Sequence, residues 1–457
     1  MFGRLKRVHF VGIGGVGMSG IALVLRNLGF EVSGSDIAES ENTRRLAEAG
    51  VKVAIGHAKE NLTDAEVVVF STAVSADNPE LAAAQERGVP IIRRAEMLAE
   101  LMRMKFAVAI SGSHGKTTVT SMTGHLLERA GLDPTVVVGG RILGNSSGAR
   151  LGASEYLVAE ADESDRSFLV LYPAIAVVTN IEAEHLDFYK DLSDIRHTFV
   201  RFLNRVPFYG AVIACTDSPA VRHILKRVKR RTVTYALDQP ADFRVKDVQL
   251  YSFSSAFTLL YRGKEQGRFG LGMPGRHNVQ NALGAIAAAN ELGIDFRVAE
   301  QALSTFAGVH RRLERKGEKS QVTVYDDYGH HPTEIRATLE ALRHAVPKSR
   351  LWVVFQPHRY TRTKALASEF GTAFDCADAV VITRVYAASE PEIPGVDETL
   401  IVDQIKAQGW SGLVVHRVPE LADVPEFLKE QCRPGDTVLT LGAGSIWRIG
   451  EQLLAKL

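Results

Sequence analysis

Short apolar runs alternate with helix-length segments along almost the whole chain. Five of the runs are VHFVGI (8–13), FAVAISG (106–112), EYLVAEA (155–161), LWVVFQP (351–357) and DTVLTLGAG (436–444). Apolar strands separated by helices are typical of parallel sheets that are covered on both faces. Ligands of such sheets bind beyond the carboxyl ends of the strands. The alternation therefore predicts an α/β protein whose functional residues follow these runs.

A chain of 457 residues is too long for one core, because single cores rarely grow beyond ~250 to 300 residues. We expect three domains. A Rossmann-like domain is predicted over 1–106, a central P-loop ATPase-type domain with a mainly parallel sheet over 107–311, and a Rossmann-like α/β domain over 312–457. Within the central domain, the alternating stretch 243–261 predicts an antiparallel side sheet. The charged segment 306–318 predicts a linker.

Bulk composition narrows the class of protein. The formal net charge is +1, so no broad field favours nucleic acid or a membrane surface as a partner. The three cysteines, Cys215, Cys376 and Cys432, are widely spaced and form no CxxC pair, which indicates a reducing compartment. The chain shows no signal-peptide pattern and no stretch of ~20 apolar residues. We expect a cytoplasmic protein.

The first apolar run leads into Gly12-x-Gly14-x-x-Gly17, and Asp36 follows about twenty residues later. This spacing is that of a dinucleotide-binding strand, turn and helix. Taken alone it also fits an NAD-dependent oxidoreductase, although nothing downstream looks like a hydride-transfer site. The loop therefore predicts a diphosphate ligand and leaves its identity open.

A second glycine loop, SGSHGKTT, follows the run at 106–112. The usual P-loop would require glycine at position 110, where Ile110 stands, so a shortened form, Gly112 to Thr117, remains. Its glycines let backbone N–H groups face phosphate oxygens at the start of a helix. Lys116 adds a positive charge, and the Thr117 hydroxyl can contact Mg²⁺. The loop predicts nucleoside triphosphate binding, either for catalysis or as a regulatory switch.

Acidic residues follow the next strands. Glu160 ends one apolar run with Asp162, Glu163 and Asp165 behind it, and Glu182, Glu184 and His185 follow another. Carboxylates at strand ends near a phosphate loop suit Mg²⁺, which prefers oxygen ligands. A solvated acidic loop and a structural histidine are the alternatives.

Three later segments carry polar side chains. In GRHNVQN, the amides of Asn278 and Asn281 suit an adenine edge, although Asn278 equally suits a helix cap. The segments DDYGHHPTEI and QPHRYTRT contain histidines, arginines and Asp327. A zinc site is not supported by their spacing. Arginine donates paired hydrogen bonds to planar anions, so these segments predict contacts to phosphate or carboxylate groups.

These motifs, in this order, resemble those of the Mur ligase family over nearly the whole chain. The resembling stretches are GIGGVGMSGIA, SGSHGKTT, EADESD, TNIEAEHLDFY, GRHNVQNALGAI, DDYGHHPTEI and QPHRYTRT. The resemblance implies an ATP-dependent ligase of peptidoglycan precursor synthesis. Its substrates would be ATP, UDP-N-acetylmuramate and L-alanine, and an acyl phosphate would be the intermediate. The protein would be a monomer or a homodimer.

The resemblance also implies a role for each motif. The first loop would hold UDP rather than a dinucleotide, through Gly14, Gly15, Gly17, Asp36 and Ser71. ATP would contact Gly112, Ser113, His114, Gly115, Lys116, Thr117, Thr118, His277, Asn278 and Asn281. Two Mg²⁺ ions are expected, with ligands drawn from Thr117, Glu160 and His185. The residues expected to act in catalysis are Lys116, Glu160, His185, His330, His358, Arg359 and Arg362. The alanine ammonium would lose its proton to one of the histidines, to Asp327 or to water.

One position departs from the family pattern. Several sibling ligases carry a carbamylated lysine fourteen residues after the HLD histidine, and here that position is Phe199. We therefore expect no carbamylated lysine, and the ligands of the second metal stay open. The nearest alternative is the recycling ligase that attaches murein tripeptide to the same nucleotide. Its first loop is typically GxxGTFMGG, whereas this chain has GIGGVGMSG.

Overall fold

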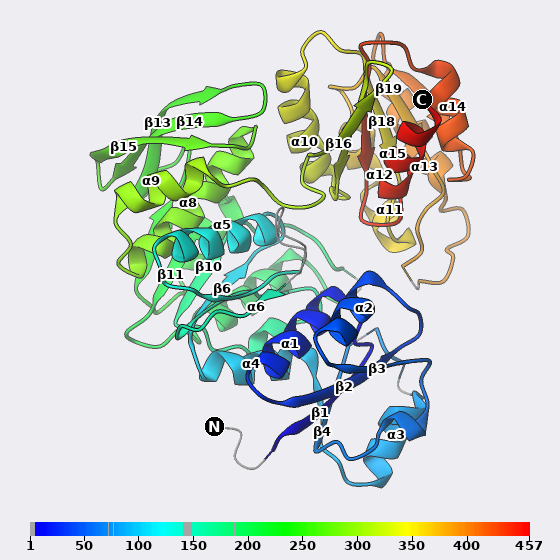
Figure 1. Cartoon of the computed structure of the whole chain (residues 1–457). Helices are drawn as coiled ribbons and strands as arrows, with labels where there is room; N and C mark the ends of the chain where they lie inside the picture. Colours follow the sequence, from blue (N-terminus) through cyan, green and yellow to red (C-terminus); the bar gives the residue numbers. More distant parts are fainter. Residues whose placement is uncertain (1–4, 72, 76, 140–148, 187, 389) are drawn as a thin grey trace. The chain divides into compact units, whose positions relative to one another are not determined.

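The computed structural model describes residues 5–71, 73–75, 77–139, 149–186, 188–388 and 390–457 (Figure 1). The chain forms two compact units. The first consists of Met1–Asp247, Phe257–Gly270 and Gln280–Ala307, and the second of Val248–Ala256, Leu271–Val279 and Gly308–Leu457. The predicted domain boundaries at residues 106 and 311 stay predictions.

The first sheet has five parallel strands in the order β3-β2-β1-β4-β5. Its strand β1 pairs with β2 on one side and β4 on the other, so the strand order reverses at β1. Such a reversal opens a crevice at the carboxyl end of the strand. The loop after β1 is therefore well placed for a ligand. The elements are β1 (Arg7–Val11), α1 (Val16–Asn27), β2 (Glu31–Asp36), α2 (Glu41–Glu48), β3 (Lys52–Ile55), η1 (Lys59–Asn61), β4 (Val67–Phe70), α3 (Pro79–Glu86), β5 (Ile91–Arg93) and α4 (Arg94–Arg103).

The second sheet has ten strands in the order β15-β14-β13-β12-β11-β10-β6-β9-β7-β8. Strand β6 lies between β10 and β9 and is parallel to both. The three loops that follow these neighbouring strands therefore meet at one edge. The elements are β6 (Phe106–Ser111), α5 (Lys116–Arg129), β7 (Thr135–Val137), β8 (Ala149–Arg150), β9 (Tyr156–Glu160), η2 (Ser167–Val170), β10 (Ile175–Val178), α6 (Leu192–Leu203), β11 (Ala211–Cys215), α7 (Pro219–Leu225), β12 (Thr232–Tyr235), β13 (Phe243–Leu250), β14 (Ser255–Tyr261), β15 (Lys264–Leu271), α8 (Arg276–Glu291) and α9 (Phe296–Ser304).

The side sheet predicted over 243–261 is present and also includes β15. Strand β14 lies between β13 and β15 in the sheet. Only residues 251–254 connect β13 to β14, and only Arg262 and Gly263, with φ values of 48° and 78°, connect β14 to β15. Connections this short join antiparallel strands, because parallel strands need a crossover of about a dozen residues. The prediction of an antiparallel side sheet is confirmed.

The third sheet has six strands in the order β16-β17-β21-β18-β19-β20, and only the edge strand β16 is antiparallel to its neighbour. The prediction that 306–318 is a linker is wrong for its second half. That half forms most of β16, because its polar residues tolerate a solvent-facing edge. The elements are β16 (Glu314–Lys319), β17 (Val322–Asp327), α10 (Pro332–Ala345), β18 (Leu351–Phe355), α11 (Tyr360–Ala365), α12 (Ala367–Gly371), β19 (Ala379–Ile382), α13 (Glu398–Ala407), β20 (Val414–Arg417), α14 (Val424–Gln431), β21 (Thr437–Leu441) and α15 (Trp447–Lys456).

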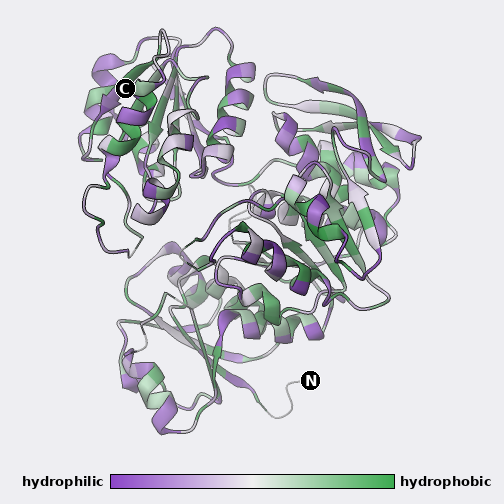
Figure 2. Cartoon of the chain, turned by 180° about the vertical axis from the view of Figure 1, so that it is seen from behind, coloured by the Kyte–Doolittle hydropathy of each residue, from purple (hydrophilic) through white to green (hydrophobic). Residues whose placement is uncertain are grey.

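The central strands form the cores. Every residue of β10, β11, β18 and β21 is buried, and Figure 2 shows the sheets largely in the hydrophobic colour while the helices also carry hydrophilic residues. Burial on both faces is the physical reason for the continuous apolar runs in the sequence. No described helix is long and apolar enough to cross a membrane.

Candidate active site

The phosphate loop, residues 112–117, connects β6 to α5 and depends on two glycines. Gly112 and Gly115 have φ values of 133° and 83°, which favour glycine. A Cβ atom at Gly112 would lie 2.1 Å from Oγ1 of Thr179, and one at Gly115 would lie 2.5 Å from Oδ1 of Asn281. The loop is therefore packed tightly against its neighbours, and the predicted ATP residue Asn281 lies beside it.

The segment after β10 anchors the first half of the loop. The N–H groups of Ser113 and His114 donate to O and Oδ1 of Asn180, at 3.0 and 2.8 Å. Oγ of Ser113 accepts from the N–H of Glu182 at 2.9 Å. These two predicted ATP residues therefore use their N–H groups to hold the loop. The first N–H groups of a helix have no partner within it, so the N–H groups available to phosphate are those of Lys116, Thr117 and Thr118.

Lys116 folds back over the loop. Its Nζ donates to the Gly112 and Ser113 carbonyls at 2.5 and 3.1 Å and pairs with Oε1 of Glu163 at 2.8 Å. Burial alone would lower the pKa of Lys116, but the carboxylates of Glu163 and Asp162 raise it above its usual value. Lys116 is therefore held as an ammonium ion at the start of α5, where a phosphate would meet it.

A buried acidic group lies beside Lys116. One ligand atom each from Glu163, Glu184 and His185 lies within 4.8 Å of the others. Oε2 of Glu163 is buried and has no hydrogen-bond partner among the described residues, and burial raises the pKa of this carboxyl to about 7. His185 has a φ of 55°, a strained value that is typical of functional positions. A buried oxygen without a partner is costly, so a cation fits this group.

Glu160 ends β9, beside the end of β6. The register pairs Ile110 with Glu160, and a Cβ atom at Gly139 would lie 2.6 Å from Oε2 of Glu160. The structure thus places Glu160 at the carboxyl edge that carries the phosphate loop, as expected from the sequence. It groups His185 with Glu163 and Glu184, two of the acids that the sequence pattern gave as suited to Mg²⁺ but that the family resemblance did not name as ligands. Position at a strand end could not distinguish Glu163 from the acids around it.

The first glycine loop is braced by Asp36. The N–H of Gly14 donates to Oδ2 of Asp36 at 2.8 Å, and Nδ2 of Asn42 donates to the Gly14 carbonyl at 2.8 Å. Gly15 is the N-cap of α1, so the helix presents its positive end directly after the loop. Ser71 follows β4, where its carbonyl accepts from the N–H of Val74 at 3.0 Å.

Arg94 is a functional candidate that sequence motifs did not reveal. A Cβ atom at Gly17 would lie 2.5 Å from Nη1 of Arg94, so the glycine makes room for a guanidinium at the start of α1. Nη2 of Arg94 also lies 3.5 Å from Oδ2 of Asp162. A cation at the positive end of a helix is unfavourable unless an anion joins it. No short motif marks this position in the sequence.

The remaining predicted ATP residues lie at the start of α8. Burial, together with the charge of Arg312, lowers the pKa of His277 to about 4, so this ring is neutral at pH 7. Nδ2 of Asn278 donates to the Pro274 carbonyl at 2.8 Å, and Asn278 is 5% exposed. Asn278 is the third residue of α8, and its amide donates to a carbonyl before the helix instead of accepting from the first helical N–H groups, so this contact is not that of a helix cap. A role of either residue in binding adenine stays a prediction.

The predicted residues of the C-terminal sheet come together in part. The rings of His330 and His358 have centroids 5.7 Å apart, and Nη1 of Arg362 lies 3.3 Å from Nδ1 of His358. Arg359 has a φ of 72°, and its Nη1 lies 3.6 Å from Oε1 of Glu390. The structure therefore forms a basic and aromatic cluster from two loops that follow β17 and β18.

Comparison with known proteins decides the family. Profiles of the Mur ligase family catalytic domain, the Mur ligase middle domain and the Mur ligase glutamate ligase domain match residues 7–106, 110–289 and 311–444. A UDP-N-acetylmuramate–L-alanine ligase of Trichlorobacter lovleyi is 52% identical over 100% of both chains, and one of Geobacter sp. is 50% identical over 100% of this chain and 99% of its own. The chain belongs to the Mur ligase family.

Solved structures of Mur ligases share the fold of this chain. The UDP-N-acetylmuramate–alanine ligase of Thermotoga maritima has a TM-score of 0.83 and 30% identity, and covers 98% of both chains. A murein peptide ligase of Psychrobacter arcticus has a TM-score of 0.74 and 25% identity, over the same shares. The predicted fold class, three α/β domains with mainly parallel sheets, is confirmed, and so is the prediction of a ligase. The reading as an NAD-dependent oxidoreductase is set aside.

Phe199, where sibling Mur ligases carry a modified lysine, is a core residue. It lies on α6, is fully buried and packs edge-to-face on Phe168 with centroids 5.2 Å apart. The position therefore contributes packing rather than a ligand in this Mur ligase.

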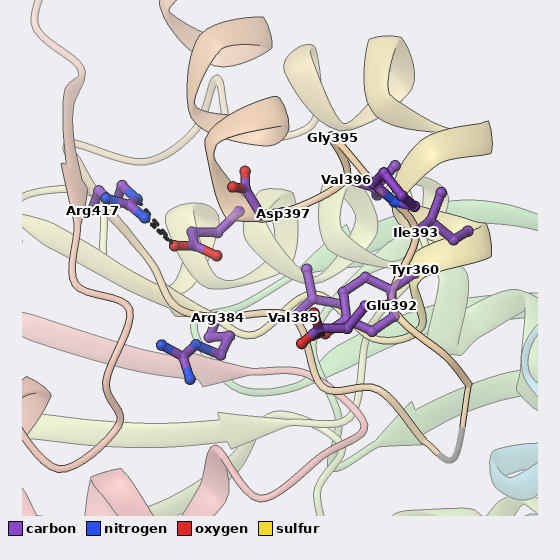
Figure 3. A pocket seen from close by; sticks show the side chains of 11 residues that line it. Tyr360, Arg384, Val385, Glu392, Ile393, Gly395, Val396, Asp397 and Arg417 are labelled. Carbon is purple, nitrogen blue, oxygen red and sulfur yellow. Dashed lines mark hydrogen bonds and ion pairs between the residues drawn. The ribbon is translucent and has the colours of Figure 1, made fainter.

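A separate cavity of about 500 Å³ lies in the C-terminal part of the ligase (Figure 3). Its wall includes Tyr360, next to the predicted Arg359. An ion pair, dashed in Figure 3, joins Arg417 to Glu398 at 2.6 Å, and Arg384 pairs with Glu420. The arginines of this cavity are thus neutralised by the protein itself, so we assign it no ligand.

His358 is expected to make folding of the C-terminal unit sensitive to acid. Burial, with His330 and Arg362 adding positive charge, lowers its pKa to about 3, whereas an unfolded chain protonates histidine near ~6.5. The unfolded state then binds more protons between these values, so stability is full above pH ~6.5 and is lost as the pH falls toward 3. Denaturant unfolding from pH 7 to 4.5 gives the free energy of unfolding as a function of pH, and His358→Gln should reduce its slope by about 1 kcal/mol per pH unit.

His344→Gln provides the matched control for this measurement. His344 is exposed on α10 and lies outside the buried histidine cluster, so this variant shows what the loss of a histidine elsewhere in the same unit does to the slope. Equal slopes for wild type and His358→Gln would contradict the expectation.

Proposed function

We propose that this Mur ligase joins the lactyl carboxylate of UDP-N-acetylmuramate to the amine of L-alanine and converts ATP to ADP and phosphate. The observation that carries the proposal is identity of 50–52% along the full chain to enzymes named for this reaction. The similarity to the T. maritima enzyme supports it over tripeptide ligation, since the murein peptide ligase is less similar. A cytoplasmic location is part of the proposal, because ATP is a substrate.

The chemistry requires activation of a poor electrophile. The γ-phosphoryl group of ATP passes to the carboxylate and forms an acyl phosphate, the alanine amine attacks its carbonyl carbon, and phosphate leaves. Catalysis of phosphoryl transfer consists mainly of positioning and charge neutralisation. The Lys116 ammonium and the backbone N–H groups at the start of α5 are suited to hold the β- and γ-phosphates.

Mg²⁺ fits the acidic group beside the phosphate loop. The buried Oε2 of Glu163, which lacks a hydrogen-bond partner among the described residues, supports this assignment, as do the neighbouring Glu184 and His185. Glu160 and Thr117 are the further ligands that we propose. A bound Mg²⁺ would neutralise charge on the phosphate oxygens.

The cluster of His330, His358, Arg359 and Arg362 is proposed to receive the amino acid and the reacting carboxylate. The two arginines suit carboxylate and phosphate oxygens. His358, with its pKa lowered to about 3 by burial, is neutral at pH 7 and too weak a base to hold the ammonium proton. It is better suited to orient Arg362, and the base stays open among His330, Asp327 and water.

The test is amino-acid-dependent release of ADP. The full chain is supplied with ATP, Mg²⁺ and UDP-N-acetylmuramate, with L-alanine in one reaction and murein tripeptide in another, and the product mass is measured. Release with L-alanine only, together with the alanyl product, is expected. Release mainly with tripeptide would assign the recycling reaction instead. Release with neither would refute the proposal.

Arg94→Ala is expected to raise the KM for UDP-N-acetylmuramate about tenfold and to leave the KM for ATP within twofold. A charge-assisted hydrogen bond to the diphosphate is worth about 1.5 kcal/mol or more, and Arg94 lies at the start of α1. Arg103→Ala, on the same helix but paired with exposed Glu100, is the matched control. An equal rise in both KM values would contradict the assignment.

A further inference from the structure

Glu80 is a fully buried carboxylate in the first turn of α3. It accepts hydrogen bonds from Oγ of Ser35 at 2.5 Å and Nδ2 of Asn61 at 2.6 Å, and Nε2 of His9 lies 3.2 Å away. Burial alone would raise its pKa, but the hydrogen bonds from His9, Ser35 and Asn61 lower it to about 2. Glu80 is therefore ionised and acts only as an acceptor.

The charge of Glu80 sets the direction of a hydrogen-bond chain. Ser35 has one hydroxyl hydrogen, which it donates to Glu80, so its oxygen must accept from its other neighbour. That neighbour is Nδ1 of His57, at 2.9 Å. His57 therefore carries its proton on Nδ1, and in the neutral ring Nε2 is an acceptor. The side chain is 16% exposed, and because Nδ1 faces buried Ser35, the exposed edge is the one that carries Nε2.

His57 lies where a nucleobase is expected. It follows β3 after Gly56, whose N–H donates to the Asp36 carbonyl at 2.8 Å. In sheets of this type the diphosphate lies at the start of the first helix and the acid after the second strand contacts the ribose, so the base extends past the ends of β2 and β3. Ile37 and Ile55, at these ends, are 78% and 55% exposed. Exposed apolar side chains beside an acceptor suit the face and edge of a planar ring.

We propose that Nε2 of His57 accepts a hydrogen bond from N3–H of the uracil ring, and that Ser35 and Glu80 are positioning residues that hold the required tautomer. Uracil carries a hydrogen on N3, whereas N3 of cytosine is an acceptor. The same site therefore rejects a cytidine nucleotide. This inference rests on the proposed function, because it takes UDP as the nucleotide of the first sheet.

The test compares the affinities of the full chain for UDP and CDP by calorimetry, without ATP or alanine. Wild type should prefer UDP. Two groups face Nδ1 of His57, Oγ of Ser35 at 2.9 Å and Oε1 of Glu80 at 3.7 Å. The double variant Ser35→Ala, Glu80→Gln removes both the acceptor and the carboxylate charge, so the ring can place its proton on Nε2, and the ratio of the CDP and UDP dissociation constants should fall at least tenfold. Ser33→Ala is the matched control, since Ser33 belongs to the same network through His9, 2.9 Å from its Nδ1, but does not contact His57.

His57→Phe keeps the inference testable where the double variant does not fold, and should lower the ratio by a similar factor. A wild type that binds CDP as tightly as UDP, a double variant with the wild-type ratio, or equal weakening of both nucleotides would overturn the inference. Alanine-dependent ADP release by the same wild-type preparation tests the proposed function separately. A failed inference and a failed function are thus distinguishable.

Discussion

Lys116→Met is expected to lower the rate of ADP release by roughly 10²–10³-fold, the scale seen when one preorganised donor to developing charge is removed. The reason is geometric. Nζ of Lys116 lies between the carbonyls of the phosphate loop and Oε1 of Glu163, where the phosphates of the proposed ATP site would meet it. The measurement is the steady-state rate at saturating ATP, UDP-N-acetylmuramate and L-alanine.

The same substitution should destabilise the folded enzyme by about 3 kcal/mol, because the buried Glu163, whose pKa burial already raises to about 7, loses its counter-ion and must stay charged without it or take up a proton. The double variant Lys116→Met, Glu163→Gln removes both charges and should recover most of that stability while staying inactive. Denaturant unfolding without Mg²⁺ and nucleotide measures both effects. A double variant with wild-type activity would show that Lys116 serves only to neutralise Glu163.

Gly112→Ala is the second substitution with a large expected effect. The new Cβ atom would lie 2.1 Å from Oγ1 of Thr179 and 3.0 Å from backbone atoms of Asn180, at a φ of 133°. If the segment after β10 or the phosphate loop moved to make room for this atom, the hydrogen bonds that join the two would be lost. We expect a loss of about 3 kcal/mol or more in the free energy of unfolding, and no measurable ATP-dependent ligation.

Gly131→Ala separates the effect of crowding from that of backbone strain. Gly131 follows the other end of α5 and has a φ of 79°, and a Cβ atom there would meet nothing within 4 Å apart from its chain neighbours. Strain alone costs about 1 kcal/mol there, and activity should remain. If Gly112→Ala lowered the free energy of unfolding no more than Gly131→Ala does, the tight packing of the phosphate loop would not contribute to stability.

Sequence motifs located the loops of the candidate site but could not choose among similar residues within them. They placed Lys116, Glu160 and His185 after neighbouring strands, and the structure puts these strand ends at one edge. They did not single out Glu163, because four acids within six residues give the same local signal. Which of them is buried depends on Lys116 and on the register of β6 with β9. Arg94 was missed because its partner Gly17 is 77 residues away in sequence.

Two segments show where local pattern was insufficient for the fold. The charged segment 306–318 predicted a linker, yet its residues 314–318 pair with β17 as part of an edge strand, since only one side of an edge strand needs a partner. Asn278 satisfied both a helix cap and an adenine contact, and the structure shows the contact to the Pro274 carbonyl. Pairing with β17 therefore decided the structure of 314–318. A contact of Asn278 with adenine stays a prediction.

The sequence by itself determined the α/β fold class, the side sheet, the two glycine loops and the family resemblance, because apolar periodicity and glycine spacing are local properties of the chain. Tertiary structure alone decided which polar groups are buried together. Lys116 and Glu163 are 47 residues apart in sequence, and Ser35 is 45 residues from Glu80 and 22 from His57. Their charges and proton positions are set by burial and by hydrogen-bond partners, and neither exists until the sheets have formed.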